Sequence, residues 1–275
     1  MQCLTTPHGL TLPKLGLGTW PMVDAPCTEA VLSALELGYR HIDTAAAYGN
    51  EAAVGAALAR TGVPRRDIHV TTKVWWDQLE PAAMRASLAR SLETLGDESV
   101  DLFMIHWPGA EGWDLAASIE TLMALHAEGL TRHIGVANFP LPLLRQVVEE
   151  IGAPLAAIQV EYHVLLGQQA LLDYARAQHM ALIAYSPLAR NRVSEWPAIQ
   201  TIARKHRVLP TQVALAWLLE QDAVAAIPKA ASRANQQANL DALQLRLDDE
   251  DRRLIAALPR NQRLVSPAFA PRWDA

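Results

Sequence analysis

Short apolar runs alternate with longer amphipathic segments along almost the whole chain. Eight such runs are rich in Val, Ile, Leu and Ala and end in polar or aromatic residues, as buried strands do. They lie at Lys14–Leu17, His41–Asp43, Ile68–Lys73, Val100–His106, His133–Ala137, Ala156–Tyr162, Ala181–Tyr185 and Val224–Pro228. Each run predicts one short strand.

The segments after these runs are rich in Ala and Leu and amphipathic, which predicts helices. We place them at Thr28–Leu37, Glu51–Ala59, Pro81–Leu95, Trp113–Glu128, Pro142–Ile151, Gln168–Gln178, Glu195–Lys205 and Ala234–Leu243. A strand followed by a helix, eight times in succession, indicates parallel βαβ units. Because no Gly/Ser-rich linker divides the chain, we predict an α/β fold with one (β/α)8 TIM barrel domain over residues 1–275.

Three segments fall outside the eight units. Residues 3–12 predict an N-terminal hairpin with His8 and Gly9 near its turn. Pro210–Glu220 and Asp248–Leu258 predict two extra helices, and an irregular tail follows the second. We expect these additions to decorate the barrel without forming a second domain.

Composition and charge exclude several classes of protein. Apolar residues make up 51% of the chain and charged residues 19%, which supports a large core. The formal net charge is −5 and no Lys/Arg-rich run is present, so the chain lacks the basic face that nucleic acid requires. No apolar stretch reaches the roughly 18–20 residues that span a bilayer. Because Cys3 and Cys27 are the only cysteines and the N-terminus resembles no secretory signal, we expect a cytoplasmic protein.

Candidate chemistry lies at the strand ends, where barrels of this type collect their reactive groups. Asp43, Lys73 and His106 each end a predicted strand, and the three strands are consecutive. Tyr48 lies in the loop just beyond Asp43. These four side chains are therefore the candidate catalytic residues.

The four residue types suit the protonation of a carbonyl oxygen. A tyrosine has a pKa of about 10, too high for easy proton donation at neutral pH. A cation such as Lys73 nearby is expected to lower that pKa by roughly 1–3, with Asp43 as the partner that a buried ammonium requires. Tyr48 would then be a general acid, and His106 would donate a hydrogen bond that orients the carbonyl.

The chain resembles the aldo-keto reductase family around these residues. The segment from Gly38 to Ala45, with Tyr48, Asn50 and Glu51 after it, resembles the family signature. Further matching segments, in strand order, are Gly16–Trp20, Thr71–Trp75, Ile105–Pro108, Ile134–Phe139 and Ile227–Lys229. The resemblance covers nearly the whole chain and implies a barrel that reduces carbonyls with NADPH. It also implies that Tyr48 is the acid and that Asp43, Lys73 and His106 assist it.

The residues themselves give only part of a cofactor site. The chain has neither a complete G-x-G-x-x-G motif nor a P-loop. Asn138, Gln159 and Tyr185 follow later strands and can hold a nicotinamide by hydrogen bonds and stacking. The resemblance assigns the two amides to the carboxamide and Tyr185 to the ring. It adds Gly18, Thr19, Trp20 and Asp43 beside the nicotinamide, and Ser186 and Leu188 along the pyrophosphate.

The adenosine end of the cofactor is expected near the last strand, where Lys229, Arg233 and Asn239 follow. A Lys and an Arg there can pair with a 2′-phosphate and so favour NADPH over NADH. Many family members carry Ser and Arg where this chain has Ala230 and Asn235. We therefore expect Arg233 to substitute.

Three tryptophans are predicted near the rim of the barrel. Trp20, Trp75 and Trp107, with Tyr48 and His106, predict a small cleft with apolar walls that binds substrate. Within the family, the tail at residues 263–267 resembles the bacterial 2,5-diketo-gluconate reductase B group, which is similar to methylglyoxal reductases. This implies a small reactive carbonyl as substrate and a monomer. Residues 186–194 differ from that group, so the physiological substrate stays open.

Two alternative functions remain. His41 with Asp43, and Glu161 with His163, each place two possible metal ligands on one face of a strand, which is compatible with a metal-dependent barrel hydrolase. We expect no metal, because Asp43 already has a role beside Lys73. The second alternative is a non-catalytic, nicotinamide-binding regulatory subunit, since the family is similar to some channel-associated subunits. A pure sensor does not need the four catalytic candidates.

Overall fold

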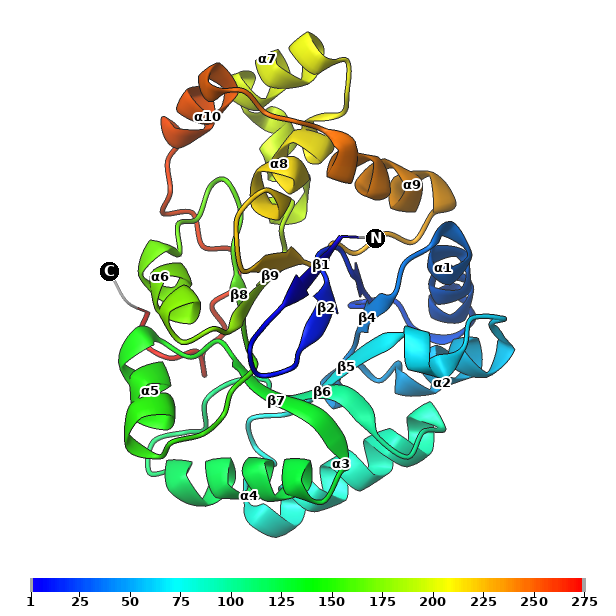
Figure 1. Cartoon of the computed structure of the whole chain (residues 1–275), viewed down its shortest axis with the longest axis vertical. Helices are drawn as coiled ribbons and strands as arrows, with labels where there is room; N and C mark the ends of the chain where they lie inside the picture. Colours follow the sequence, from blue (N-terminus) through cyan, green and yellow to red (C-terminus); the bar gives the residue numbers. More distant parts are fainter. Residues whose placement is uncertain (1, 274–275) are drawn as a thin grey trace.

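The computed structural model describes residues 2–273, and a ring of eight parallel strands forms its centre (Figure 1). Each strand pairs with the next along the chain. Their bounds are β3 (Leu17–Gly18), β4 (His41–Asp43), β5 (His69–Val74), β6 (Val100–Ile105), β7 (Thr131–Ala137), β8 (Ala157–Glu161), β9 (Ala181–Tyr185) and β10 (Val224–Ala226). Parallel bridges from Leu15 to Ala226 and from Gly18 to Lys229 join the first strand to the last. The predicted barrel is thus confirmed, although its first strand begins later than expected because Leu15 makes only an isolated bridge.

The helices surround the strands and also match the prediction. The eight that follow barrel strands are α1 (Asp24–Leu37), α2 (Glu51–Arg60), α3 (Pro81–Leu95), α4 (Leu115–Ala127), α5 (Leu141–Arg145), α6 (Gln169–Ala177), α7 (Pro197–His206) and α9 (Arg233–Asp241). A π-helical turn at Gln146–Glu150 extends α5. The two predicted extra helices are present as α8 (Pro210–Leu219) and α10 (Asp249–Ala256).

Helix α3 shows how local sequence sets these elements. Pro81 occupies its first turn, where a missing N–H costs nothing. Its buried residues recur every three or four positions, so one face packs on the strands: Met84, Ser87, Leu88, Ser91, Leu92 and Leu95. Gly96 ends the helix with φ 70°, a left-handed conformation that glycine adopts without strain. The chain then turns directly into β6.

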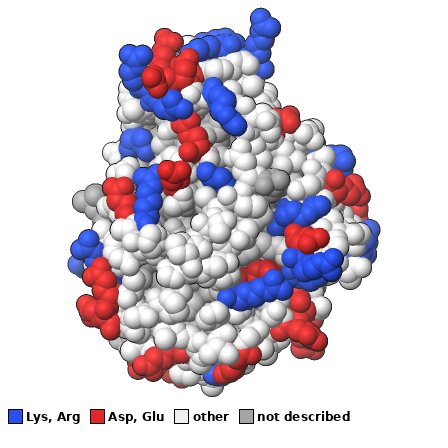
Figure 2. Space-filling view, viewed as in Figure 1, with Lys and Arg blue, Asp and Glu red and all other residues white. Residues whose placement is uncertain are grey.

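A hairpin closes the N-terminal end of the barrel. Strands β1 (Cys3–Thr5) and β2 (Thr11–Pro13) pair antiparallel, as predicted, and lie across the ring of strands in Figure 1. Leu10 and Leu12 of the hairpin pack against Leu102, Met104 and Ile183 inside the barrel. Figure 2 shows the same face, with acidic and basic side chains mixed at its top and edges and in a band to the right of the centre. Because this end is packed shut, the functional cavity must open at the opposite end.

The chain ends in an extended segment, residues 259–273, which we call the C-terminal tail. It is drawn in red in Figure 1, on the side of α5 and α6. Its start pairs with the loop after β8, through a bridge between Leu166 and Asn261. No helix within residues 2–273 is long and apolar enough to cross a membrane.

Candidate active site

The ends of β4 and β5 form a buried ion pair at the C-terminal end of the barrel. Lys73 Nζ donates to Asp43 Oδ1 at 2.6 Å and to the carbonyl oxygen of Thr44 at 2.8 Å, and the lysine is fully buried. Gln159 Nε2 donates to the other carboxylate oxygen of Asp43 at 2.8 Å. Thr19 holds the main-chain carbonyl of Asp43. The pair is therefore fixed from three strands, β4, β5 and β8.

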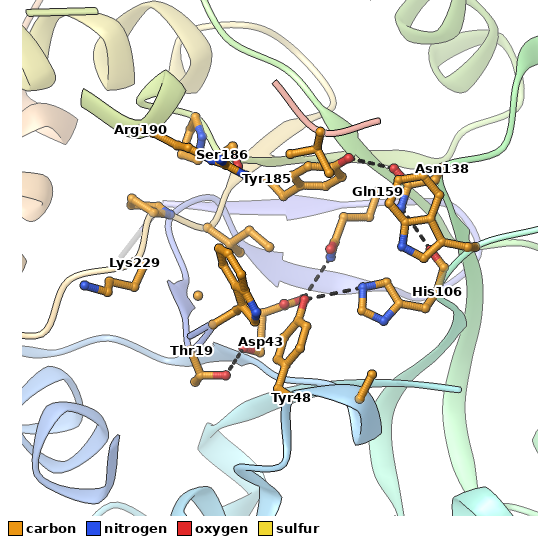
Figure 3. A pocket seen from close by; sticks show the side chains of 18 of the residues that line it. Thr19, Asp43, Tyr48, His106, Asn138, Gln159, Tyr185, Ser186, Arg190 and Lys229 are labelled. Atoms are coloured by element: carbon orange, nitrogen blue, oxygen red, sulfur yellow. Dashed lines mark hydrogen bonds between the residues drawn. The ribbon is translucent and has the colours of Figure 1, made fainter. Parts of the chain in front are cut away.

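Tyr48 lies over this ion pair, at the end of a short 3-10 turn, Ala46–Tyr48. Its ring centroid is 5.1 Å from Lys73 Nζ. Its hydroxyl oxygen is 3.5 Å from His106 Nε2, as Figure 3 shows. The ring of His106 also meets the edge of Trp75, with centroids 5.0 Å apart. The four predicted catalytic candidates are thus brought together.

The electrostatics of Tyr48 differ from the expectation. Burial raises the pKa of Tyr48 well above its usual value, and the Asp43 and Tyr185 charges add to this. The prediction that Lys73 lowers the Tyr48 pKa is wrong for the free site. The physical reason is that Lys73 directs its N–H groups to Asp43 and Thr44, while burial of the ring disfavours the charged phenolate. Tyr48 therefore keeps its proton throughout the physiological range.

His106 is neutral in this environment. Burial lowers its pKa well below 6.5, and the Lys73 charge lowers it further. A neutral imidazole carries one N–H, so His106 can donate a hydrogen bond without being an acid itself. Its Nδ1 is buried and has no hydrogen-bond partner among the described residues. Tyr48 and His106 thus present two hydrogen-bond donors to the same point.

A cavity of about 1610 Å³ begins at these donors and runs across the end of the barrel. Most of the predicted binding residues line it. They are Gly18, Thr19, Trp20, Asp43, Tyr48, Trp75, His106, Trp107, Asn138, Gln159, Tyr185, Ser186, Leu188, Lys229 and Asn239. Lys73 is buried behind this lining. The cavity therefore connects the expected substrate and cofactor residues in one continuous space.

Arg233 is the exception among the predicted binding residues. Its Nη1 lies 3.0 Å from Glu36 Oε2 on α1, and it does not line the cavity. Position 233 is the first residue of α9, and its side chain extends over the surface toward α1. The expectation that Arg233 replaces a missing phosphate ligand is therefore not supported by its placement.

The amides and the aromatic ring predicted for a nicotinamide line the same part of the cavity, at the ends of neighbouring strands (Figure 3). Tyr185 donates from its hydroxyl to Asn138 Oδ1 at 2.7 Å, and Asn138 Nδ2 donates to the carbonyl oxygen of His106 at 2.9 Å. Asn138 adopts a φ of 63°, which Asn tolerates better than most residues. This chain of bonds links the expected cofactor residues to His106.

Among the cavity residues that the sequence did not predict are a loop pair and a group from the tail. Arg190 and Asn191 line the cavity from the loop after β9, where both adopt left-handed backbone angles. Their position just beyond a strand end was the available signal. Residues 264–267 and Phe269 line it from the tail, and Phe269 meets the rings of Trp75 and Trp107 at 5.4 and 5.5 Å. No local pattern pairs this distant tail with the barrel.

The residue pairs considered as metal ligands have other partners. Asp43 is bonded to Lys73 and Gln159, and Glu161 is 3.0 Å from His163. Within residues 2–273, no group of three or more His, Cys, Asp and Glu side chains is arranged to hold a metal ion.

Comparison with known proteins identifies the family. Residues 14–259 match the model of the Aldo/keto reductase family. The methylglyoxal reductase DkgB of Salmonella typhi is 40% identical over 268 residues, covering 96% of this chain and 100% of that protein. A solved structure of a protein provisionally named 2,5-diketo-D-gluconic acid reductase B has a TM-score of 0.94 at 36% identity, covering 100% and 98%. The aldose reductase of Schistosoma japonicum gives 0.91 at 28% identity, covering 98% and 96%. The chain therefore belongs to the aldo/keto reductase family and is an oxidoreductase.

Proposed function

We propose that this enzyme reduces small aldehydes and ketones to alcohols with NADPH, and that Tyr48 is the general acid. The observation that carries the proposal is the Tyr48–His106 pair at one end of a cavity that continues to Lys229. The cavity volume of about 1610 Å³ exceeds the roughly 300–1,000 Å³ of ordinary small-molecule sites. Such a space suits a dinucleotide together with a small substrate.

The residues present fit a nicotinamide dinucleotide. Asn138 and Gln159 offer amides for the carboxamide, and Tyr185 offers an aromatic face for the ring. Lys229 and Arg190 place two cations farther along the cavity, where they would hold phosphate oxygens. Recognition of a 2′-phosphate by Lys229 or Arg190, rather than by Arg233, would favour NADPH over NADH. When bound, the cofactor supplies a hydride to the carbonyl carbon.

The protein's own part is to hold the carbonyl oxygen and protonate it. The oxygen would lie between the Tyr48 hydroxyl and His106 Nε2, both of which can donate. As negative charge gathers on that oxygen, the Tyr48 proton moves to it, because an alkoxide is a stronger base than a phenolate. Lys73 then stabilises the phenolate left behind, with Asp43 holding the lysine in place. The raised pKa of Tyr48 is compatible with this order of events, because the proton leaves only after charge has developed.

The candidate substrates are methylglyoxal, 2,5-diketo-gluconate and other small reactive carbonyls. The names of the relatives in Salmonella typhi and among the solved structures support this range. Trp20, Trp75 and Trp107 line the cavity, and Trp75 contacts His106, so they would form apolar walls for a compact substrate.

The test follows NADPH absorbance with methylglyoxal, 2,5-diketo-gluconate and an aromatic aldehyde, for the wild type and Tyr48→Phe. Loss of the acid should reduce kcat by about 10²–10⁴-fold. Cofactor affinity, measured by fluorescence titration, should change by less than about twofold, because the ring remains in place. Turnover of Tyr48→Phe at the wild-type rate would contradict the acid assignment.

The same assay separates two other possibilities. Tight NADPH binding without oxidation by any carbonyl would favour the regulatory-subunit alternative. A higher kcat/KM with NADH than with NADPH would contradict the proposed cofactor preference and leave the acid assignment standing.

A further inference from the structure

Glu161 and His163 form a fully buried pair that the proposed chemistry does not use. Glu161 ends β8, two residues after Gln159. A buried carboxylate is costly unless several donors surround it. The pair therefore needs a structural explanation.

The donors that satisfy Glu161 come from the C-terminal tail and from His163. Main-chain N–H groups of Leu264 and Val265 donate to Oε1 and Oε2, at 2.8 and 2.9 Å. His163 Nε2 lies 3.0 Å from Oε1. Because His163 Nδ1 accepts from the N–H of Leu165 at 3.2 Å, the imidazole proton sits on Nε2 and is donated to Glu161. The Glu161 carboxylate thus accepts hydrogen bonds from three donors, two of which are consecutive tail N–H groups. We call this set of bonds the clamp.

The tail residues after this clamp form one wall of the cavity. Phe269 lies among the rings of Trp75, Trp76 and Trp107, with centroids 5.1–5.5 Å away. The next bonds along the tail, from Ala270 N–H to Pro267 and from Trp273 Nε1 to Ser266, join the tail to itself. The start of the tail is held at residues 260–262 by main-chain bonds to the loop after β8, and its far part by the ring contacts of Phe269 and Trp273. Between them, Leu264 and Val265 join the tail to β8, so the bonds to Glu161 help to set the position of the wall relative to the barrel.

We propose that Glu161, oriented by His163, is a positioning residue that fixes the C-terminal tail so that Phe269 completes the aromatic wall at the substrate end. The clamp thereby sets the affinity for carbonyl substrates large enough to touch that wall. Glu161 acts through the tail and does not contact the reacting atoms. The kinetic part of this inference rests on the proposed reductase activity, whereas the clamp itself can be tested without turnover.

The central variant is Glu161→Gln. Its amide nitrogen replaces one acceptor, so a donor would face either a tail N–H or His163 Nε2–H. Leaving one buried N–H unsatisfied should raise KM for an aromatic aldehyde about tenfold. Methylglyoxal is too small to reach Phe269, so its KM should change by less than about twofold. The values of kcat and of the NADPH dissociation constant should also change by less than about twofold. Glu149→Gln makes the same exchange at an exposed position and should change none of these values.

A double-mutant cycle tests whether Glu161 acts through Phe269. Phe269→Ala should raise the aromatic-aldehyde KM by itself, and adding Glu161→Gln should then raise it by less than about twofold more. Additive effects of the two substitutions would overturn the inference. Equal loss of affinity for methylglyoxal and the aromatic aldehyde in Glu161→Gln would also overturn it.

Two measurements do not depend on activity. In the wild-type protein, the amide protons of Leu264 and Val265 should exchange at least about tenfold more slowly than that of Ala268, by NMR. In Glu161→Gln, trypsin should cleave after Arg263 about tenfold faster than in the wild type. Equal exchange rates at residues 264, 265 and 268 would contradict the clamp. This test uses only the wild-type protein, so it stands even if Glu161→Gln does not fold. If the amides of residues 264 and 265 exchange slowly but the wild-type protein turns over no carbonyl, the clamp is supported and the proposed function is contradicted.

Discussion

At the C-terminal end of the barrel, His106 lies against Tyr48 and Trp75 in the wall of a large cavity. At the N-terminal end, His41 and His69 meet edge to face, with ring centroids 5.1 Å apart, where the hairpin closes the barrel. All three rings are buried, and burial lowers the pKa of each below 6.5. The two ends thus hold the same kind of side chain in the same electrostatic state.

The difference between the ends lies in what surrounds the rings. Each of the three rings has one buried nitrogen without a hydrogen-bond partner among the described residues. His41 and His69 do not line the cavity, whereas His106 faces a space that can admit a carbonyl. A shifted pKa reports burial, nearby charges and hydrogen bonds, and does not by itself show a function. It identifies a functional site only where an acid, a cavity and a second donor converge on one point.

The largest expected effect comes from breaking the ion pair at the C-terminal end. Asp43→Asn would leave Lys73 buried without its charge partner, which should lower the free energy of unfolding by about 3–5 kcal/mol. It should also reduce kcat/KM by roughly 10²-fold or more, because Lys73 no longer holds its place beneath Tyr48. Urea denaturation and initial rates measure the two effects. A stable, fully active Asp43→Asn enzyme would show that the pair does not support the Tyr48 acid.

The comparison also separates what the sequence could predict from what it could not. Barrel, hairpin and both extra helices follow from local patterns, because each strand and helix buries its own apolar face. Asp43, Lys73 and His106 follow as well, since parallel strands carry their last residues to one rim. The pKa of Tyr48 does not follow, because desolvation depends on packing from several elements at once. Nor does Phe269, which reaches Trp75 only after the chain has circled the whole barrel.

The next effect is the loss of stability in acid, to which His41 and His69 contribute at the N-terminal end. The folded-state pKa of His41 is about 4 because of burial, below the usual 6.5, and that of His69 is also lowered. As the pH falls, the unfolded chain binds these protons before the folded chain does. The stabilisation from His41 is therefore complete above pH 6.5 and is lost between 6.5 and about 4. We expect His41 to account for about 3 kcal/mol of that loss. Thermal melts across this range measure it.

His69→Phe is the variant that isolates this end. It replaces a ring whose buried Nε2 has no partner, so stability at neutral pH should rise or stay within about 1 kcal/mol. The fall in melting temperature below pH 6.5 should become shallower, while kcat/KM should stay within about twofold. His8→Phe in the exposed turn of the hairpin serves as the matched control and should leave the acid slope unchanged. An unaltered slope in His69→Phe would mean that other groups cause the acid loss.

The smallest expected effect is the response of catalysis itself to acid. Because burial and the Lys73 charge hold the His106 pKa well below 6.5, the imidazole stays neutral as the pH falls through that value. Initial-rate kcat/KM should therefore change by less than about twofold between about pH 8 and about pH 6. His106→Asn keeps an N–H donor but cannot titrate there, so its profile should have the same shape at a lower level. A wild-type loss of rate centred near 6.5, absent in His106→Asn, would mean that His106 is solvated and charged during turnover, and the two ends of the barrel would no longer share one electrostatic state.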